Sequence, residues 1–211
     1  IFTQDAPGLL TLPFRNSREF DEHLDDPRKN AVLIGPGAGV NRTTHEMVQI
    51  AARRQKQLVL DADGLTVFSG DSASLFEAIS DIPCVLTPHE GEFSKIFRIP
   101  GDKLSRAKNA ALKSRSVVVL KGSDTIIAAP DGRTVINENA PATLATAGSG
   151  DVLAGSIVGL MAQGMPAFEA ACAATWINAD VATRHGPGLI AEDLPRGIPL
   201  SLRELMLSDL A

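Results

Sequence analysis

The most informative stretch of this sequence is a loop of small residues that runs into an apolar helix, Ala147-Gly148-Ser149-Gly150-Asp151-Val152-Leu153-Ala154-Gly155. The glycines let an anion approach the backbone, and the start of the helix offers that anion free N–H groups and the positive end of its dipole. Asp151 stands where its carboxylate would repel a phosphate. It is therefore either a general base beside a phosphate-binding turn or an ordinary acidic residue in a first helical turn.

Buried strands that end in loops of small or polar residues precede this stretch. The apolar segment 31–34 is followed by a glycine-rich loop over 35–39, and the apolar segment 57–60 is followed by Asp61 and Asp63. In parallel α/β sheets, ligands bind at the carboxyl ends of the strands. These two carboxylates suit holding Mg²⁺ or positioning a substrate, and they equally suit capping the turn that follows. We expect Asp61 to lie near the site.

Two later strand ends also carry polar groups. The strand that starts at Cys84 leads into the segment 87–92, where His89 is either a ligand contact or an exposed loop histidine. The strand 116–120 leads into Lys121-Gly122-Ser123-Asp124-Thr125. A lysine, a glycine and two hydroxyls at a strand end suit the phosphates or the ribose of a nucleotide.

The remaining segments predict an α/β domain. Segments 126–129 and 134–136 flank Pro130-Asp131-Gly132, which predicts a hairpin at an antiparallel edge of an otherwise parallel sheet. Helical spacing predicts helices over 18–26, 43–56, 71–82, 102–116, 151–163 and 167–185, and a last one within 189–211. Asp102 is the expected cap of its helix, and Gly164 the expected stop of another. No repeat and no linker divides the chain, so we expect one domain over residues 1–211.

The composition excludes several functional classes. The net charge of −5, the pI near 5.4, the 4% aromatic content and the absence of tyrosine argue against a nucleic-acid binder. Cys84 and Cys172 each sit in an apolar run, so both are expected to be buried free thiols in a reducing compartment. No stretch has the pattern of a signal peptide or a membrane span, and we therefore expect a cytoplasmic protein with no membrane partner.

Taken in chain order, these motifs resemble the ADP- or ATP-dependent NAD(P)H-hydrate dehydratase family, a branch of the ribokinase-like fold. The motifs are Gly35-Pro36-Gly37-Ala38-Gly39, Asp61-Ala62-Asp63-Gly64, Leu86-Thr87-Pro88-His89-Glu90-Gly91-Glu92, Lys121-Gly122-Ser123-Asp124-Thr125 and the stretch 147–155. The match covers about residues 30 to 205, as judged from the order of the motifs. The resemblance implies a three-layer α/β/α fold with a mostly parallel central sheet and an antiparallel edge hairpin.

The resemblance also implies an activity, the repair of NADH or NADPH that carries an added water at C6 of the nicotinamide ring. The family phosphorylates that hydroxyl, in the S epimer, with ADP or ATP. It then eliminates phosphate, which restores the cofactor, so the enzyme is a lyase. By this resemblance Asp151 is the base that takes the hydroxyl proton, a role in which position matters most.

Further site residues follow from the same resemblance. The turn from Gly148 through Ser149 to Gly150 would stabilise the transferring phosphoryl group. The implied nucleotide contacts are Lys121, Gly122, Ser123, Asp124, Thr125 and Gly150. The implied contacts to the hydrated dinucleotide are Gly39, His89 and Asp151. Phosphoryl transfer implies Mg²⁺ as well, and the sequence assigns it no ligands.

Some features depart from the family pattern. The family's N-terminal strand and Gly/Ser-rich substrate loop have no match in residues 1–30, and the chain starts at Ile1, so we expect a fragment or a processed product that lacks its N-terminal segment. Asn178-Ala179 stands where relatives often carry His-Gly, and Glu192-Asp193 where Ser-Asp is usual. Family analogy further implies a fused or separate epimerase domain as a partner, and a homo-oligomer, a tetramer.

Two other functions remain open at this point. A ribokinase-like kinase for a small alcohol, of the hydroxymethylpyrimidine or hydroxyethylthiazole type, shares the glycine-rich turn and its aspartate. The segment 87–92 favours the dehydratase branch over that kinase. A non-catalytic nucleotide-binding fragment is the third interpretation, and it predicts stabilisation by ADP or ATP without turnover.

Overall fold

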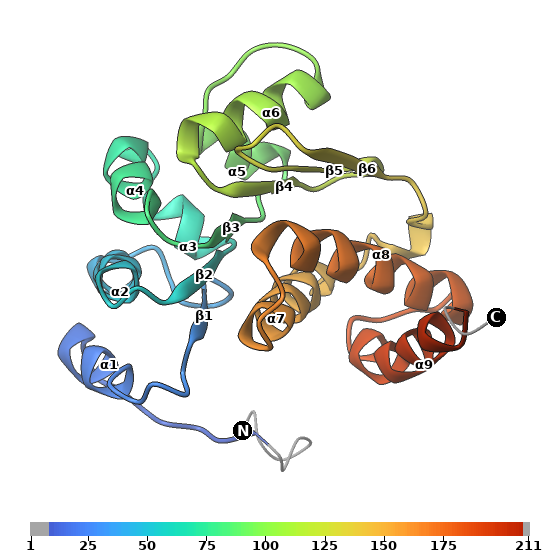
Figure 1. Cartoon of the computed structure of the whole chain (residues 1–211), viewed down its shortest axis with the longest axis horizontal. Helices are drawn as coiled ribbons and strands as arrows, with labels where there is room; N and C mark the ends of the chain where they lie inside the picture. Colours follow the sequence, from blue (N-terminus) through green and yellow to red (C-terminus); the bar gives the residue numbers. More distant parts are fainter. Residues whose placement is uncertain (1–8, 209–211) are drawn as a thin grey trace.

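The computed structural model describes residues 9–208, in which a central sheet lies between two layers of helices (Figure 1). Within those residues the sheet has six strands in the order β1-β2-β3-β4-β5-β6. The strands are β1 (Ala31–Ile34), β2 (Gln57–Leu60), β3 (Cys84–Leu86), β4 (Val117–Leu120), β5 (Thr125–Ala128) and β6 (Thr134–Asn137). The expected domain over residues 1–211 and the expected last helix within 189–211 reach into residues 1–8 and 209–211, which lie outside the described residues.

The sheet is parallel in its first part and antiparallel at one edge. Strands β1 to β4 pair in parallel, and β5 pairs antiparallel with both β4 and β6. Because the parallel strands all run in one direction, their carboxyl ends lie along the same border of the sheet, called here its carboxyl edge, and the polar loops follow there. The predicted hairpin is confirmed. Its first strand begins at Thr125, so the loop that starts at Lys121 ends inside β5.

Helices cover both faces of the sheet, as the predicted three-layer architecture requires. Helices α2, α4 and α6 lie on one side, and α7 and α8 on the other, with α9 packed on α8 away from the sheet (Figure 1). The helices are α1 (Ser17–His23), α2 (Arg42–Arg53), α3 (Asp63–Thr66), α4 (Ser72–Ile79), α5 (Glu90–Ile96), α6 (Lys103–Ser114), α7 (Ser149–Ala162), α8 (Ala167–His185) and α9 (Asp193–Ser208), with a 3-10 turn η1 (Ala142–Leu144). The α/β fold class is therefore confirmed.

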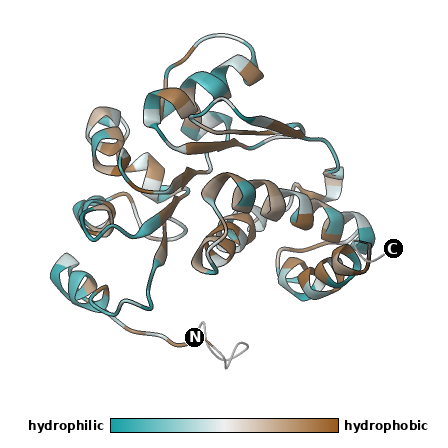
Figure 2. Cartoon of the chain, in the orientation of Figure 1, coloured by the Kyte–Doolittle hydropathy of each residue, from teal (hydrophilic) through white to brown (hydrophobic). Residues whose placement is uncertain are grey.

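Alternation along the strands divides the core between the two faces. In β2, Leu58 and Leu60 belong to the cluster under α2, α4 and α6, whereas Val59 belongs to the cluster under α7 and α8. Successive side chains of a strand point to opposite faces, so a strand buried on both faces is apolar throughout. Figure 2 shows these central strands as the most hydrophobic part of the fold.

Local signals place several helix ends where the sequence predicts them. Asp102 is the N-cap of α6 and accepts a hydrogen bond from the Ser105 N–H at 2.9 Å. Gly164 follows the end of α7 with a φ of 91°. Both expectations are confirmed. Among residues 9–208, the model contains no helix with the length and apolarity needed to cross a membrane.

The two cysteines differ in burial. Cys84 on β3 is buried, as expected, but Cys172 is only half-buried, so the expectation of two buried thiols is wrong for Cys172. The reason is position, because Cys172 lies on the side of α8 that borders a shallow hollow beside Ile136 and Trp176. Both thiols are free, as predicted.

Candidate functional site

A cavity of about 770 Å³ opens at the carboxyl edge of the sheet, between the end of β4, the hairpin, the start of α7 and the middle of α8. The predicted site residues on its wall are His89, Lys121, Gly122, Ser123, Thr125, Ser149 and Gly150. Predicted residues that are not on its wall are Gly39, Asp124, Gly148 and Asp151. The fold thus brings two predicted loops, 121–125 and 148–151, to one cavity of a size that suits a nucleotide.

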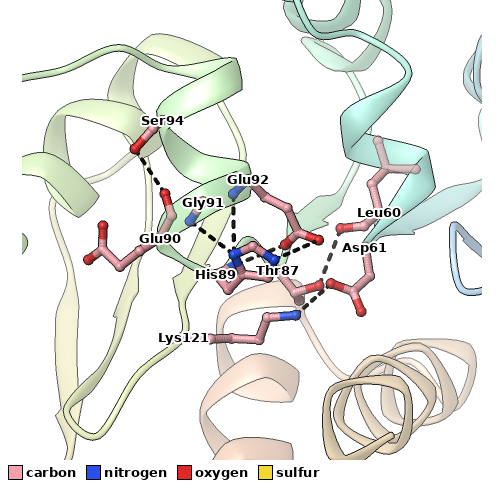
Figure 3. Close-up of polar contacts among 9 residues, drawn as sticks. All are labelled: Leu60, Asp61, Thr87, His89, Glu90, Gly91, Glu92, Ser94 and Lys121. Carbon is pink, nitrogen blue, oxygen red and sulfur yellow. Dashed lines mark hydrogen bonds and ion pairs between the residues drawn. The ribbon is translucent and has the colours of Figure 1, made fainter. Parts of the chain in front are cut away.

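A charge pair lies beside this cavity. Lys121 Nζ donates to Asp61 Oδ1 at 2.7 Å, and the side chains are 20% and 2% exposed. The two residues follow β4 and β2, so their side chains meet because both strands end at the same edge (Figure 3). Burying the Asp61 carboxylate is tolerated only because the ammonium compensates its charge. A phosphate entering the cavity would find this lysine already oriented.

The start of α7 packs against that charge pair at Gly150. A Cβ placed on Gly150 would lie 3.3 Å from Lys121 Nζ and 3.9 Å from Asp61 Oδ2. Gly150 is the second residue of α7, so its backbone lies where the unpaired N–H groups of the helix point. A larger side chain there would crowd the ammonium, which accounts for the glycine.

The turn before α7 is shaped by Gly148. This residue is the N-cap of α7, has a φ of 85° in the left-handed region and forms no side-chain cap. Glycine adopts that conformation without strain. The Ser149 N–H donates to the Thr146 carbonyl at 3.3 Å, whereas no side chain caps the helix start and the Gly150 N–H remains available to an anion.

Asp151 lies in the first turn of α7 and is exposed. The N-cap is Gly148 rather than Asp151, and among the described residues the Asp151 side chain makes no hydrogen bond or ion pair. A capping bond therefore does not explain this carboxylate. It is free to accept a proton from a ligand that lies beside the start of the helix.

His89 has a structural role that the sequence interpretation missed. It is the N-cap of α5, where Nδ1 accepts hydrogen bonds from the N–H groups of Gly91 (2.9 Å) and Glu92 (3.3 Å). In return, the Glu92 carboxylate accepts from the His89 N–H at 2.9 Å (Figure 3). This is a capping box, and a glutamate three residues after the cap was the signal for it. The ring is still 59% exposed and borders the cavity.

Gly39 is held by an aspartate from the neighbouring strand end. The Gly39 N–H donates to Asp63 Oδ2 at 2.8 Å, whereas the N-cap of α3 is Ala62. The alternative that Asp63 caps the next helix is therefore wrong, since its carboxylate fixes the glycine loop instead. A Cβ on Gly35 or Gly64 would overlap the opposing backbone, so the two loops need glycine to pack this closely.

Two amides contribute to the cavity wall without having been predicted. Asn137 at the end of β6 and Asn178 on α8 are 7% and 2% exposed, and the Nδ2 atom of each has no hydrogen-bond partner. Asn178 is one of the positions at which we expect the chain to depart from the family pattern, and it lies on the wall of the cavity.

The carboxylates near the site do not form a metal cage. Within residues 9–208, no cluster of three or more His, Cys, Asp or Glu side chains is placed to hold a metal ion. Asp61 and Asp63 are each engaged, with Lys121 and with the Gly39 N–H. The described residues therefore assign no protein ligands to Mg²⁺.

Comparison with known proteins agrees with this arrangement. The model of the NAD(P)H-hydrate dehydratase family matches residues 3–196 of the 211. The chain belongs to this family. The family resemblance stated from the motifs is therefore confirmed.

Individual relatives support the same membership. A bifunctional NAD(P)H-hydrate repair enzyme of Salinibacter ruber is 41% identical over 179 residues, which are 81% of this chain and 33% of that enzyme. An ADP-dependent (S)-NAD(P)H-hydrate dehydratase of Neisseria meningitidis is 35% identical over 192 residues, 84% of this chain and 63% of that enzyme. The chain thus spans about one third to just under two thirds of the length of these relatives.

A solved structure in the same family has a similar fold. The ADP/ATP-dependent NAD(P)H-hydrate dehydratase of Bacillus subtilis, co-crystallised with ATP and Mg²⁺, aligns with a TM-score of 0.71 at 27% identity. The alignment covers 83% of this chain and 64% of that one.

Proposed function

We propose that this chain is a lyase that uses ADP or ATP to dehydrate the S epimer of hydrated NADH or NADPH. The observation that carries the proposal is that Gly150, at the start of α7, lies against the Lys121–Asp61 pair beside the 770 Å³ cavity. Family membership supports it, as do the activities named for the relatives from Neisseria meningitidis and Bacillus subtilis.

In the proposed mechanism, the nucleotide lies in the cavity with its phosphates toward Lys121 and the start of α7. The Lys121 ammonium and the Gly150 N–H stabilise the charge that develops on the transferring phosphoryl group. The Ser149 N–H, which donates to the Thr146 carbonyl at 3.3 Å, would have to exchange that bond to join them. Thr125 shapes the loop, because its hydroxyl donates to the Gly122 carbonyl at 3.0 Å. These groups are preformed, so little reorganisation is needed when the nucleotide binds.

Asp151 acts on the second substrate. The C6 hydroxyl of the hydrated dinucleotide attacks the terminal phosphorus of the nucleotide, and the hydroxyl proton passes to the Asp151 carboxylate. The bond between that phosphorus and the departing nucleotide breaks. AMP leaves if the donor is ADP, and ADP leaves if it is ATP. In the elimination, the C6–O bond breaks, inorganic phosphate leaves and a proton is lost from C5 to solvent, which restores the C5–C6 double bond of the nicotinamide ring. Gly39 and His89 would contact this dinucleotide.

Further features follow from the proposed function rather than from the fold. Mg²⁺ would enter with the nucleotide, bound mainly through its phosphates. Repair of reduced nicotinamide nucleotides would place the chain in the cytoplasm, where free thiols persist. A fused or separate epimerase domain would supply the S epimer, and we expect a homo-oligomer, a tetramer.

The test is to add ADP to hydrated NADH with the purified chain and to follow the absorbance of the reduced nicotinamide. We expect the absorbance to recover only when the nucleotide and the chain are both present. Phosphorylation of hydroxymethylpyrimidine or a thiazole alcohol without such recovery would establish the small-alcohol kinase instead. Stabilisation by ADP without turnover of either substrate class would establish a nucleotide-binding fragment.

A further inference from the structure

A second lysine, Lys103, reaches the nucleotide loop from helix α6. Its Nζ donates to the Asp124 carbonyl at 2.7 Å and to Asp124 Oδ1 at 2.6 Å. The Lys103 side chain is 18% exposed, so most of it is enclosed between α6 and the loop. One ammonium thus holds both the backbone and the side chain of Asp124.

The position of this lysine in its helix is unusual. Lys103 is the first residue of α6, where the helix dipole disfavours a positive charge. Other lysines of the helix, such as Lys108, lie further along it. The unfavourable interaction of the Lys103 charge with the helix dipole is offset by the two charge-assisted hydrogen bonds to Asp124, which are stronger than bonds between neutral groups. The placement is therefore explained by the loop and not by the helix.

Gly122 makes room for the ammonium. A Cβ on Gly122 would overlap Lys103 Nζ, and the same glycine lies on the cavity wall. The Lys103 charge consequently lies directly behind the wall of the cavity, beside the loop that begins with Lys121. Two cations therefore flank one short loop, one paired with Asp61 and one with Asp124.

Asp124 would be harmful to nucleotide binding without that partner. A carboxylate in a loop that faces a nucleotide repels the phosphates across a few ångströms. The hydrogen bond from Lys103 is the main cause that lowers the pKa of Asp124 below its ordinary value, so the carboxylate stays charged and paired. The pairing turns the carboxylate toward α6, and Asp124 is absent from the cavity wall.

We propose that Lys103 is a positioning residue for nucleotide binding, which fixes the loop 122–124 and neutralises Asp124 against the anionic nucleotide. The inference rests on the proposed function for the identity of that nucleotide, ADP or ATP. It adds a residue outside the predicted motifs and gives Asp124 a role different from the direct contact that the resemblance implied.

The test compares Lys103→Met with Lys108→Met, an exposed lysine on the same helix. We expect K103M to weaken ADP binding, measured by titration calorimetry, about three- to tenfold, which is the range for losing one or two charge-assisted bonds at a partly exposed site. K108M should bind ADP as the wild type does. In turnover assays K103M should raise the KM for ADP and leave kcat within about twofold.

A double variant separates the charge effect from a general loss of structure. K103M with Asp124→Asn removes the repulsive carboxylate, and it should bind ADP more tightly than K103M alone. Equal ADP affinity of K103M and the wild type, or no recovery in the double variant, would overturn the inference. A wild type that binds ADP but does not repair hydrated NADH would refute the proposed function and leave this comparison intact.

Discussion

Two regions at the carboxyl edge of the sheet use small and polar residues in different ways. Around Lys121 and Gly150, the polar groups face a cavity and are placed for a ligand. Around Gly39 and His89, polar groups bind the protein itself, through Asp63 and through the start of α5, although the His89 ring also borders the cavity. Similar motifs at neighbouring strand ends therefore line the cavity in one region, where we propose that the nucleotide binds, and fix loops in the other, from which Gly39 and His89 would still reach the dinucleotide.

The largest effect expected in the first region comes from Asp151→Asn. This change removes the proposed base and leaves the helix start and the cavity in place. We expect kcat for the repair of hydrated NADH to fall by about 10²–10⁴-fold, with ADP affinity within about twofold of the wild type. Steady-state kinetics and calorimetry measure the two quantities. A rate within about tenfold of the wild type would rule out the base role.

The next effect concerns the buried charge pair of the same region. Lys121→Met leaves the Asp61 carboxylate, which is 2% exposed, without a compensating charge. We expect the free energy of unfolding to fall by about 2–3 kcal/mol, less than for a fully enclosed pair because Lys121 is partly exposed. Denaturant titration measures it, with Lys95→Met on the surface of α5 as the matched control.

A double variant tests the cause of that loss. Asp61→Asn combined with K121M removes the lone charge, and it should be more stable than K121M alone. If both variants were equally unstable, the loss of unfolding free energy would come from the packing of the Lys121 side chain and not from its charge.

In the second region the expected effect is smaller and has a different origin. His89→Ala removes the N-cap of α5 and should cost about 1 kcal/mol of stability. His89→Asp keeps an acceptor at the cap and should retain most of that stability while losing the imidazole. Thermal and denaturant unfolding compare the two variants. Equal stability of H89A and the wild type would remove the structural role of this histidine.

The smallest effect concerns the thiols, which lie outside both regions. Burial raises the pKa of Cys84 to about 12, and it raises the pKa of Cys172 to about 11. Because the thiolate is the reactive form, both cysteines should react slowly with iodoacetamide at neutral pH, and Cys84 more slowly. Mass spectrometry of the intact chain measures this. Rapid modification of Cys84 would show that β3 is less enclosed than the fold indicates.

The sheet could be predicted from the sequence because each strand is a short apolar run followed by a polar loop. The run at 117–120 is an example, since all four residues are buried. Contacts within one loop or helix start, such as the Asp102 cap, could be predicted for the same reason, because the interacting groups are neighbours in sequence.

Contacts between distant segments could not be predicted in this way. Lys121 and Asp61 are separated by 60 positions, so only the strand order brings them together. The cap formed by His89 was also missed, because histidine is not among the residues that usually cap helices. Lys103 did leave a signal, a positive charge in a first helical turn, but its partner Asp124 lies 21 positions away.

A crystal structure of the chain with ADP and Mg²⁺ would locate the nucleotide directly. We expect the phosphates at the start of α7, within hydrogen-bonding distance of the Gly150 N–H and of Lys121 Nζ, and the remainder of the nucleotide in the 770 Å³ cavity. The cap at His89 and the bond between Asp63 and Gly39 should be unchanged. ADP bound elsewhere, with the Lys121–Asp61 pair untouched by phosphate, would contradict the assignment of this region as the nucleotide site.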